Sequence, residues 1–170
     1  MIELMVVVAI VATLIALAAP SFTPMIERWR VRQAVEEMVA TLYFARSEGV
    51  KRGGAVVIEK IANSPGICTL APNNEDWGCG WRIFSDTNRD GSWQAGEPIL
   101  QTASPPANTE ITIPSNGGKI SVDRWGAFNG MSATAITFVP KGKNVSDQAS
   151  AAICVSSGGR IRTIAGSGVC

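Results

Sequence analysis

The chain has 170 residues, of which 46% are hydrophobic and 17% are charged, and its 15 Lys and Arg residues nearly balance its 14 Asp and Glu residues. This length suits one domain with an appendage, large enough to bury a core without help from a metal. Histidine is absent, which excludes Ser-His-Asp and Cys-His nucleophile systems and the common His-containing zinc sites. No glycine-rich phosphate loop is present either. We therefore predict a protein that is not an enzyme and needs no cofactor.

The first twenty residues are almost entirely apolar. From residue 4 to residue 19 only Thr13 is polar, and a helix of this length covers roughly 24 Å, slightly less than the ~30 Å hydrocarbon core of a bilayer. Modest bilayer thinning would let it span. A secretory signal peptide is disfavoured, because no Lys or Arg precedes Arg28. Glu3 has two interpretations: a functional intramembrane acid, or a carboxylate at a helix start where the macrodipole favours it.

A second helical pattern follows the prolines at positions 20 and 24. Apolar residues recur at spacings of three and four, which predicts one stripe that packs on a domain. We expect one long helix, kinked or locally melted at the prolines and ended at Gly49. The stripe consists of Val31, Ala34, Val35, Met38, Val39, Leu42 and Ala45.

Beyond residue 54 the pattern is that of β-strands. Short β-branched segments alternate with turns rich in Gly, Pro, Asn and Ser, and no further helix is convincing. The sequence therefore predicts an α+β chain with an apolar helix over residues 1–20, an amphipathic helix over 21–50 and a β-domain over 51–170. The expected strands are Ala55–Ile61, Trp81–Phe84, Ile99–Thr102, Ile111–Ile113, Ala135–Val139, Ala151–Val155 and Arg160–Ile164.

Three stretches of the chain carry a family resemblance. Residues 1–22 (MIELMVVVAIVATLIALAAPSF) are similar to the N-terminal helix of type IV pilins and type II secretion pseudopilins. Residues 43–48 (YFARSE) and the C-terminal Gly-Arg-x-Arg at 159–162 resemble the GspH/FimT family of minor pilins, most closely its FimT branch. The resemblance covers nearly the whole chain. The family's leader, its glycine cleavage site and its first aromatic residue are missing, so we expect the sequence to begin just inside the mature chain.

Four cysteines, at positions 68, 79, 154 and 170, allow three disulfide pairings. Their even number and wide spacing in an exported setting indicate two disulfides. We favour Cys68–Cys79 and Cys154–Cys170, because each would close a local segment that contains a turn. A four-cysteine zinc site would need short paired spacings, which are absent.

An acidic segment matches the calcium-loop pattern D-x-[DN]-x-[DN]-G-x5-E through Asp86, Asn88, Asp90 and Glu97. Hard oxygen donors at alternate positions suit Ca²⁺. However, strand patterns rather than helices flank the segment. A β-hairpin loop whose side chains bond their own backbone is therefore the favoured interpretation.

Arg160 and Arg162 are separated by one residue. On a strand their side chains would point to the same face, roughly 7 Å apart, and each guanidinium could grip a phosphate. The alternative is two solvated arginines on an edge strand. Residues 111–170 hold six basic side chains and two acidic ones, which favours a basic surface. Further candidates for that surface are Lys119, Arg124, Lys141 and Lys143.

The resemblance implies a function. In such families the helix glutamate, here Glu3, pairs with the N-terminal amine of a neighbouring subunit, and the first residue of the mature helix is methylated. The FimT motif, here Gly159, Arg160 and Arg162, is associated with double-stranded DNA binding in natural transformation. The chain would sit in the inner membrane with its domain in the periplasm and then join other pilins at the cell surface. A structural or priming minor pilin like FimU, or a GspH-type pseudopilin, is the alternative.

Overall fold

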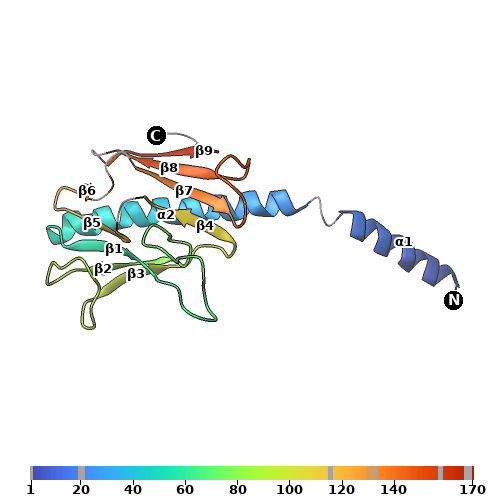
Figure 1. The fold of residues 1–170 in the computed structure, drawn as a ribbon, viewed down its shortest axis with the longest axis horizontal. Helices are drawn as coiled ribbons and strands as arrows, with labels where there is room; N and C mark the ends of the chain where they lie inside the picture. The colour runs from blue at the N-terminus through green and yellow to red at the C-terminus, as the bar shows by residue number, and fades with distance from the viewer. Residues whose placement is uncertain are drawn as a thin grey trace.

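The fold was analysed in a computed structural model, which describes residues 2–18, 22–114, 117–129, 131, 134–156, 159–166 and 170. Two helices precede a β-domain built from two antiparallel sheets. Figure 1 shows that α2 runs along the domain, while α1 extends beyond it at the N-terminal end. This arrangement confirms the predicted α+β class.

The described residues form one helix for each of the two helical patterns. Helix α1 spans Ile2–Ala18 and α2 spans Thr23–Arg52. Pro24 lies in the first turn of α2, where its missing N–H removes no helical hydrogen bond. The expected kink at Pro20 lies outside the described residues.

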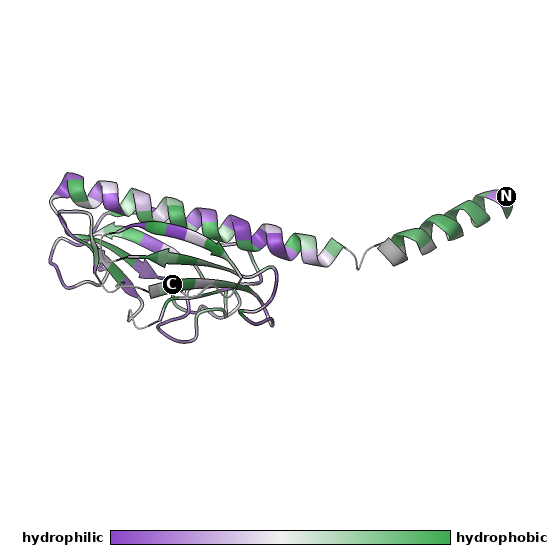
Figure 2. Ribbon diagram, turned by 90° about the horizontal axis from the view of Figure 1, so that it is seen from above, coloured by the Kyte–Doolittle hydropathy of each residue, from purple (hydrophilic) through white to green (hydrophobic). Residues whose placement is uncertain are grey.

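Helix α1 is apolar along its described length except at Glu3 and Thr13 (Figure 2). The side chains of residues 2–15 are all exposed, Glu3 included. In the described ranges, no helix combines the length and the apolar character that crossing a membrane requires.

Helix α2 buries one face on the sheets, at the spacing that the sequence predicted. Its buried residues include Val31, Met38 and Leu42, whereas Val39 is only partly buried. The prediction that Gly49 ends the helix is wrong. A Cβ at Gly49 would lie 2.7 Å from Val122 Cγ1, so the glycine permits close helix–sheet packing. The helix ends instead at a left-handed Gly53, as the C-terminal cap.

The first sheet has the strand order β3-β2-β1-β5-β6, and the second has the order β4-β7-β8-β9. All the described pairings are antiparallel. In the second sheet β9 is an edge strand. The strand bounds are β1 Val56–Lys60, β2 Trp81–Ser85, β3 Ile99–Ala103, β4 Thr109–Thr112, β5 Lys119–Val122, β6 Phe128–Asn129, β7 Thr134–Pro140, β8 Ala151–Val155 and β9 Ile161–Ala165.

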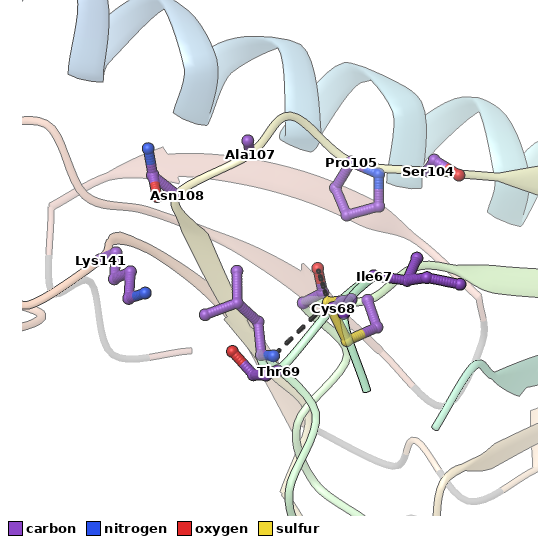
Figure 3. Close-up of a pocket in the computed structure, with 12 residues that line it drawn as sticks. Ile67, Cys68, Thr69, Ser104, Pro105, Ala107, Asn108 and Lys141 are labelled. Carbon is purple, nitrogen blue, oxygen red and sulfur yellow. Dashed lines mark hydrogen bonds between the residues drawn. A yellow bond between two sulfur atoms is a disulfide. The ribbon is translucent and has the colours of Figure 1, made fainter. Parts of the chain in front are cut away.

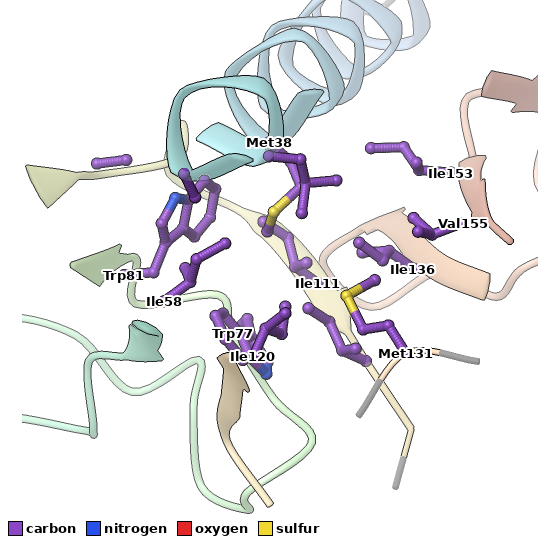
Figure 4. Close-up of a cluster of buried hydrophobic side chains, with 14 of the residues drawn as sticks. Met38, Ile58, Trp77, Trp81, Ile111, Ile120, Met131, Ile136, Ile153 and Val155 are labelled. Carbon is purple, nitrogen blue, oxygen red and sulfur yellow. The ribbon is translucent and has the colours of Figure 1, made fainter. Parts of the chain in front are cut away.

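The core lies where α2 meets both sheets (Figure 4). Met38 projects from the helix between side chains of the first sheet, such as Ile58, and side chains of the second, such as Ile136. Trp81 is fully buried, and its indole N–H donates to Thr41 Oγ1 at 2.9 Å, so its polar group is satisfied inside the core. One continuous core therefore fixes the two sheets and α2 as a unit.

Candidate nucleic-acid interface

Arg160 and Arg162 lie together at the edge of the second sheet. Arg162 is on β9, Arg160 directly precedes that strand, and both side chains are exposed. They line one hollow of about 260 Å³, which agrees with the prediction that they share a face. Within the described part of the chain, neither arginine forms a salt bridge. The remaining lining residues are Cys154, Val155, Ser156 and Cys170.

A disulfide forms the floor of this region. The structure joins Cys154 to Cys170 and Cys68 to Cys79, which is the favoured pairing of the three possible ones. Cys154 is on β8 directly opposite Arg162 in the strand register. The bridge therefore ties the C-terminus of the chain to the strand beside the arginine pair.

Ser156 holds the two residues that directly precede β9. Ser156 Oγ accepts the Arg160 N–H at 3.1 Å, and the Ser156 carbonyl oxygen accepts the Gly159 N–H at 2.7 Å. Gly159 is buried and adopts a left-handed conformation with φ of 75°. Its role is to shape the turn that presents Arg160, because a residue with a Cβ is strained there.

Arg46 of α2 fastens this turn to the helix. Its Nη2 donates to the Gly159 carbonyl oxygen at 2.6 Å, and its Nε donates to the Gly126 carbonyl oxygen at 2.9 Å. Its guanidinium also lies 5.1 Å from the centre of the Phe128 ring. A Cβ added at Gly159 would overlap Arg46 Nη2, so the glycine and the arginine fit one another.

This role of Arg46 was not predicted from the sequence. Residues 43–48 were noted only as a family signature, and the partners of Arg46 lie 80 and 113 residues away along the chain. Spacing cannot reveal such contacts. Its position on α2, next to the buried Ala45, is the one available sign that its side chain reaches the sheets.

The lysines at positions 141 and 143 lie apart from the arginine pair. Across the sheet, Arg162 on β9 pairs with Cys154 on β8, and Cys154 pairs with Ala135 near the start of β7. Lys141 lies at the other end of β7, directly after its last residue. Five strand residues lie between Ala135 and Lys141, so the two positions are six residue steps, or roughly 20 Å, apart along β7. Lys141 instead lines a hollow of about 520 Å³ beside the Cys68–Cys79 disulfide (Figure 3), and Lys143 lies 3.8 Å from Asp147.

The two other basic candidates, Lys119 and Arg124, lie in or just after β5 of the first sheet and do not line the hollow that holds the arginine pair. Lys119 begins β5 in the first sheet, where its Nζ donates to Ser92 Oγ. Arg124 follows that strand and lines a hollow that also contains Asp86 and Asp90. The structure therefore does not gather all six basic residues into one patch, and the arginine pair stands out from the rest.

The acidic loop is closed by its own backbone. Asp86 Oδ2 accepts the Gly91 N–H at 2.9 Å, and the two Glu97 carboxylate oxygens accept backbone N–H groups at 2.8 and 3.0 Å. Asn88 and Asp90 each accept a backbone N–H from two residues further on. Asp86 Oδ1 is buried and has no partner there. No group of three or more acidic or cysteine side chains among the described residues could hold a metal ion.

Two ionisable groups have a clearly shifted pKa, and both lie outside the arginine region. The hydrogen bond from Arg52 lowers the pKa of Glu48, with Lys51 adding to the effect. Burial lowers the pKa of Lys60, although the negative charge of Asp76 opposes this. Neither shift bears on the candidate interface.

Comparison with known proteins identifies the family. The family model for type II transport protein GspH matches residues 34–159, which is most of the chain. No curated protein matches the sequence.

Two crystal structures of the type IV minor pilin FimU from Pseudomonas aeruginosa PAO1 have a similar fold. The P65 form is 22% identical, with a TM-score of 0.58 over 78% of this chain and 91% of that one. The P21 form is 24% identical, with a TM-score of 0.60 over 80% and 89%. Given the extent of the family match and the shared pilin fold, this chain belongs to the GspH family.

Proposed function

We propose that this chain is a minor pilin of a type IV pilus that binds extracellular double-stranded DNA through Arg160 and Arg162 for uptake in natural transformation. The observation that carries the proposal is the pairing of two exposed arginines, without a salt bridge to any described residue, in one hollow at an edge strand. The Gly-Arg-x-Arg resemblance at residues 159–162 supports it.

The chemistry of the pair suits the DNA backbone. A guanidinium offers a planar fork of N–H donors that matches phosphate oxygens. Phosphate contacts carry no information about base sequence, so the binding should be non-specific. The expected dissociation constant is ~10⁻⁴–10⁻⁶ M at physiological salt, and binding should weaken as salt rises.

Helix α1 would anchor the protein before assembly and join the filament core afterwards. Its exposed apolar side chains need cover, which inner-membrane lipid or the helices of neighbouring pilins would provide. Glu3, in the first turn of α1, would pair with the N-terminal amine of the adjacent subunit. The β-domain would lie in the periplasm until the subunit reaches the cell surface.

A structural or priming minor pilin is the second candidate. The similarity to the minor pilin FimU and the match to the GspH family support this second candidate, since both describe pilus or secretion components and need no DNA binding. A GspH-type pseudopilin belongs to the same class. In these readings the arginines keep β9 soluble and discourage edge-to-edge pairing.

The test is a gel-shift titration of the full-length protein in detergent with double-stranded DNA at several salt concentrations. The Arg160→Gln/Arg162→Gln variant should bind more weakly, and its log–log salt slope should become shallower by roughly 2, since each phosphate contact contributes about 0.9. Lys141→Gln/Lys143→Gln removes the same charge at the far end of the sheet and is the matched control.

Equal losses in the two variants would show that only total charge matters. Unchanged affinity and slope in a folded arginine variant would leave the structural minor pilin as the better description.

A further inference from the structure

An exposed tryptophan lies on a turn that Arg46 links to the residue before Arg160. Trp125 is 81% exposed, whereas Trp77 and Trp81 are fully buried. It occupies the turn between β5 and β6, and the Arg124 guanidinium lies 5.9 Å from its ring centre. An indole exposed to this extent adds little buried area to the core and is accessible to a binding partner.

The turn that carries Trp125 is firmly built. Asp123 Oδ1 accepts the backbone N–H groups of Trp125 at 2.8 Å and of Ala127 at 2.9 Å. The Gly126 N–H donates to the Asp123 carbonyl oxygen at 3.0 Å, and Asp123 and Ala127 are also joined through their backbones at 3.1 Å. The carboxylate of Asp123 is thus used inside the turn, and the indole is presented from a fixed backbone.

Arg46 places this turn beside the arginine motif. One guanidinium bonds both the Gly126 carbonyl oxygen, directly after Trp125, and the Gly159 carbonyl oxygen, directly before Arg160. Two carbonyl groups held by the same planar group are necessarily close neighbours. Figure 1 shows the turn between β5 and β6 at the end of the domain that lies farthest from α1.

We propose that Trp125 is a base-stacking platform that forms one nucleic-acid surface with Arg160 and Arg162. The inference rests on the proposed function and extends its ligand from double-stranded DNA to strands with accessible bases, namely single-stranded DNA and frayed duplex ends. Aromatic side chains beside a basic track are how proteins hold single strands without sequence preference, since every base has a π-face. The pair holds the phosphates and the indole holds a base. Arg124 is not counted, because it also faces Asp86 and Asp90.

The experiment measures binding of the full-length protein in detergent to three probes of equal length: oligothymidylate, an abasic strand and a duplex. Trp125→Ala should weaken oligothymidylate binding about 5–150-fold, the equivalent of ~1–3 kcal/mol of stacking. Its affinity for the abasic strand and its salt slope should not change, because the phosphate contacts remain. Trp125→Phe keeps a ring and should restore most of the affinity.

Trp29→Ala is the matched control, because Trp29 is another exposed tryptophan (63%) but lies on α2, outside the turn between β5 and β6 that carries Trp125. Circular dichroism confirms that each variant is folded. Quenching of tryptophan fluorescence by oligothymidylate should be lost in Trp125→Ala and kept in Trp29→Ala.

The outcomes distinguish a failure of the stacking role of Trp125 from a failure of DNA binding by the arginine pair. If the wild-type protein binds none of the probes, the DNA-binding proposal fails and this one fails with it. If the wild type binds but Trp125→Ala affects oligothymidylate and the abasic strand alike, the stacking role is overturned and the arginine site stands. Normal strand binding with poor recovery in sheared pili would also overturn it, assigning Trp125 to a contact between subunits.

Discussion

Replacing Arg46 tests whether one helix side chain holds two distant turns. Arg46→Met keeps an unbranched apolar stem but removes hydrogen bonds of 2.6 and 2.9 Å to two carbonyl groups and the cation–π contact with Phe128. Hydrogen bonds from a charged donor contribute about 1.5–3 kcal/mol each, and a cation–π contact contributes ~0.5–2 kcal/mol. These contributions are not additive and the methionine recovers some packing, so we expect a loss of about 2–4 kcal/mol in the free energy of unfolding.

The measurement is thermal unfolding of the full-length protein, followed by circular dichroism. A loss of that size should lower the melting temperature by roughly 4–16 °C for a domain in this size range. Arg52→Met is the matched control, because its ion pair with Glu48 joins residues one turn apart on the same helix, and such local pairs contribute little to stability.

Arg46→Lys separates charge from bonding geometry. A lysine keeps the positive charge but cannot reach both carbonyl groups with one fork. It should therefore lie between the wild type and Arg46→Met in stability. If Arg46→Met is no less stable than Arg52→Met, the idea that Arg46 holds the two turns together is refuted.

Three further predictions concern other parts of the chain. Glu3→Ala should leave the protein in the membrane fraction but remove it from sheared pili, and normal amounts there would show that the carboxylate has no role in assembly. Removing the Cys154–Cys170 disulfide should lower the free energy of unfolding by about 3 kcal/mol and weaken DNA binding. Removing the Cys68–Cys79 disulfide should lower stability by a similar amount with little effect on DNA binding. Equal effects of the two changes on DNA binding would contradict the placement of the binding hollow beside Cys154 and Cys170. Gly49→Ala should lower the free energy of unfolding in urea titrations, because overpacking against Val122 costs roughly 1–3 kcal/mol. This cost should outweigh a gain of about 1 kcal/mol in helix propensity. A more stable variant would show that the helix can move off the sheet.

Local patterns predicted the elements that depend on local chemistry. The spacing of three and four along α2 gave its buried face, and β-branched segments gave most of the strands. Strand β5 was missed because its four residues, of which Ile120 and Val122 are buried, are too few to stand out. Strand β6 has two residues and gives no signal at all.

Contacts between distant segments could not be predicted in this way. The division of the strands into two sheets depends on which edges meet α2, and no local pattern encodes that. Gly49 looked like a helix stop because its close approach to Val122 is a tertiary feature. For the same reason the sequence placed Arg160 and Arg162 together but gave no sign of Arg46, and it grouped Lys141 with them although the sheet separates the two.

A chain with a net charge of +1 can bind a polyanion only if its charges are unevenly placed. In the acidic loop between Asp86 and Glu97, carboxylate oxygens accept backbone N–H groups of the same loop, so hydrogen bonds within the loop use part of their acceptor capacity. Arg160 and Arg162 are exposed and form no salt bridge with any residue that the structure describes. At physiological salt, exposed charges farther apart than about 8 Å are largely screened from each other. DNA at β9 would therefore sense the arginines beside it rather than the balance of the whole chain, and this is why the predicted change in salt slope belongs to the arginine pair.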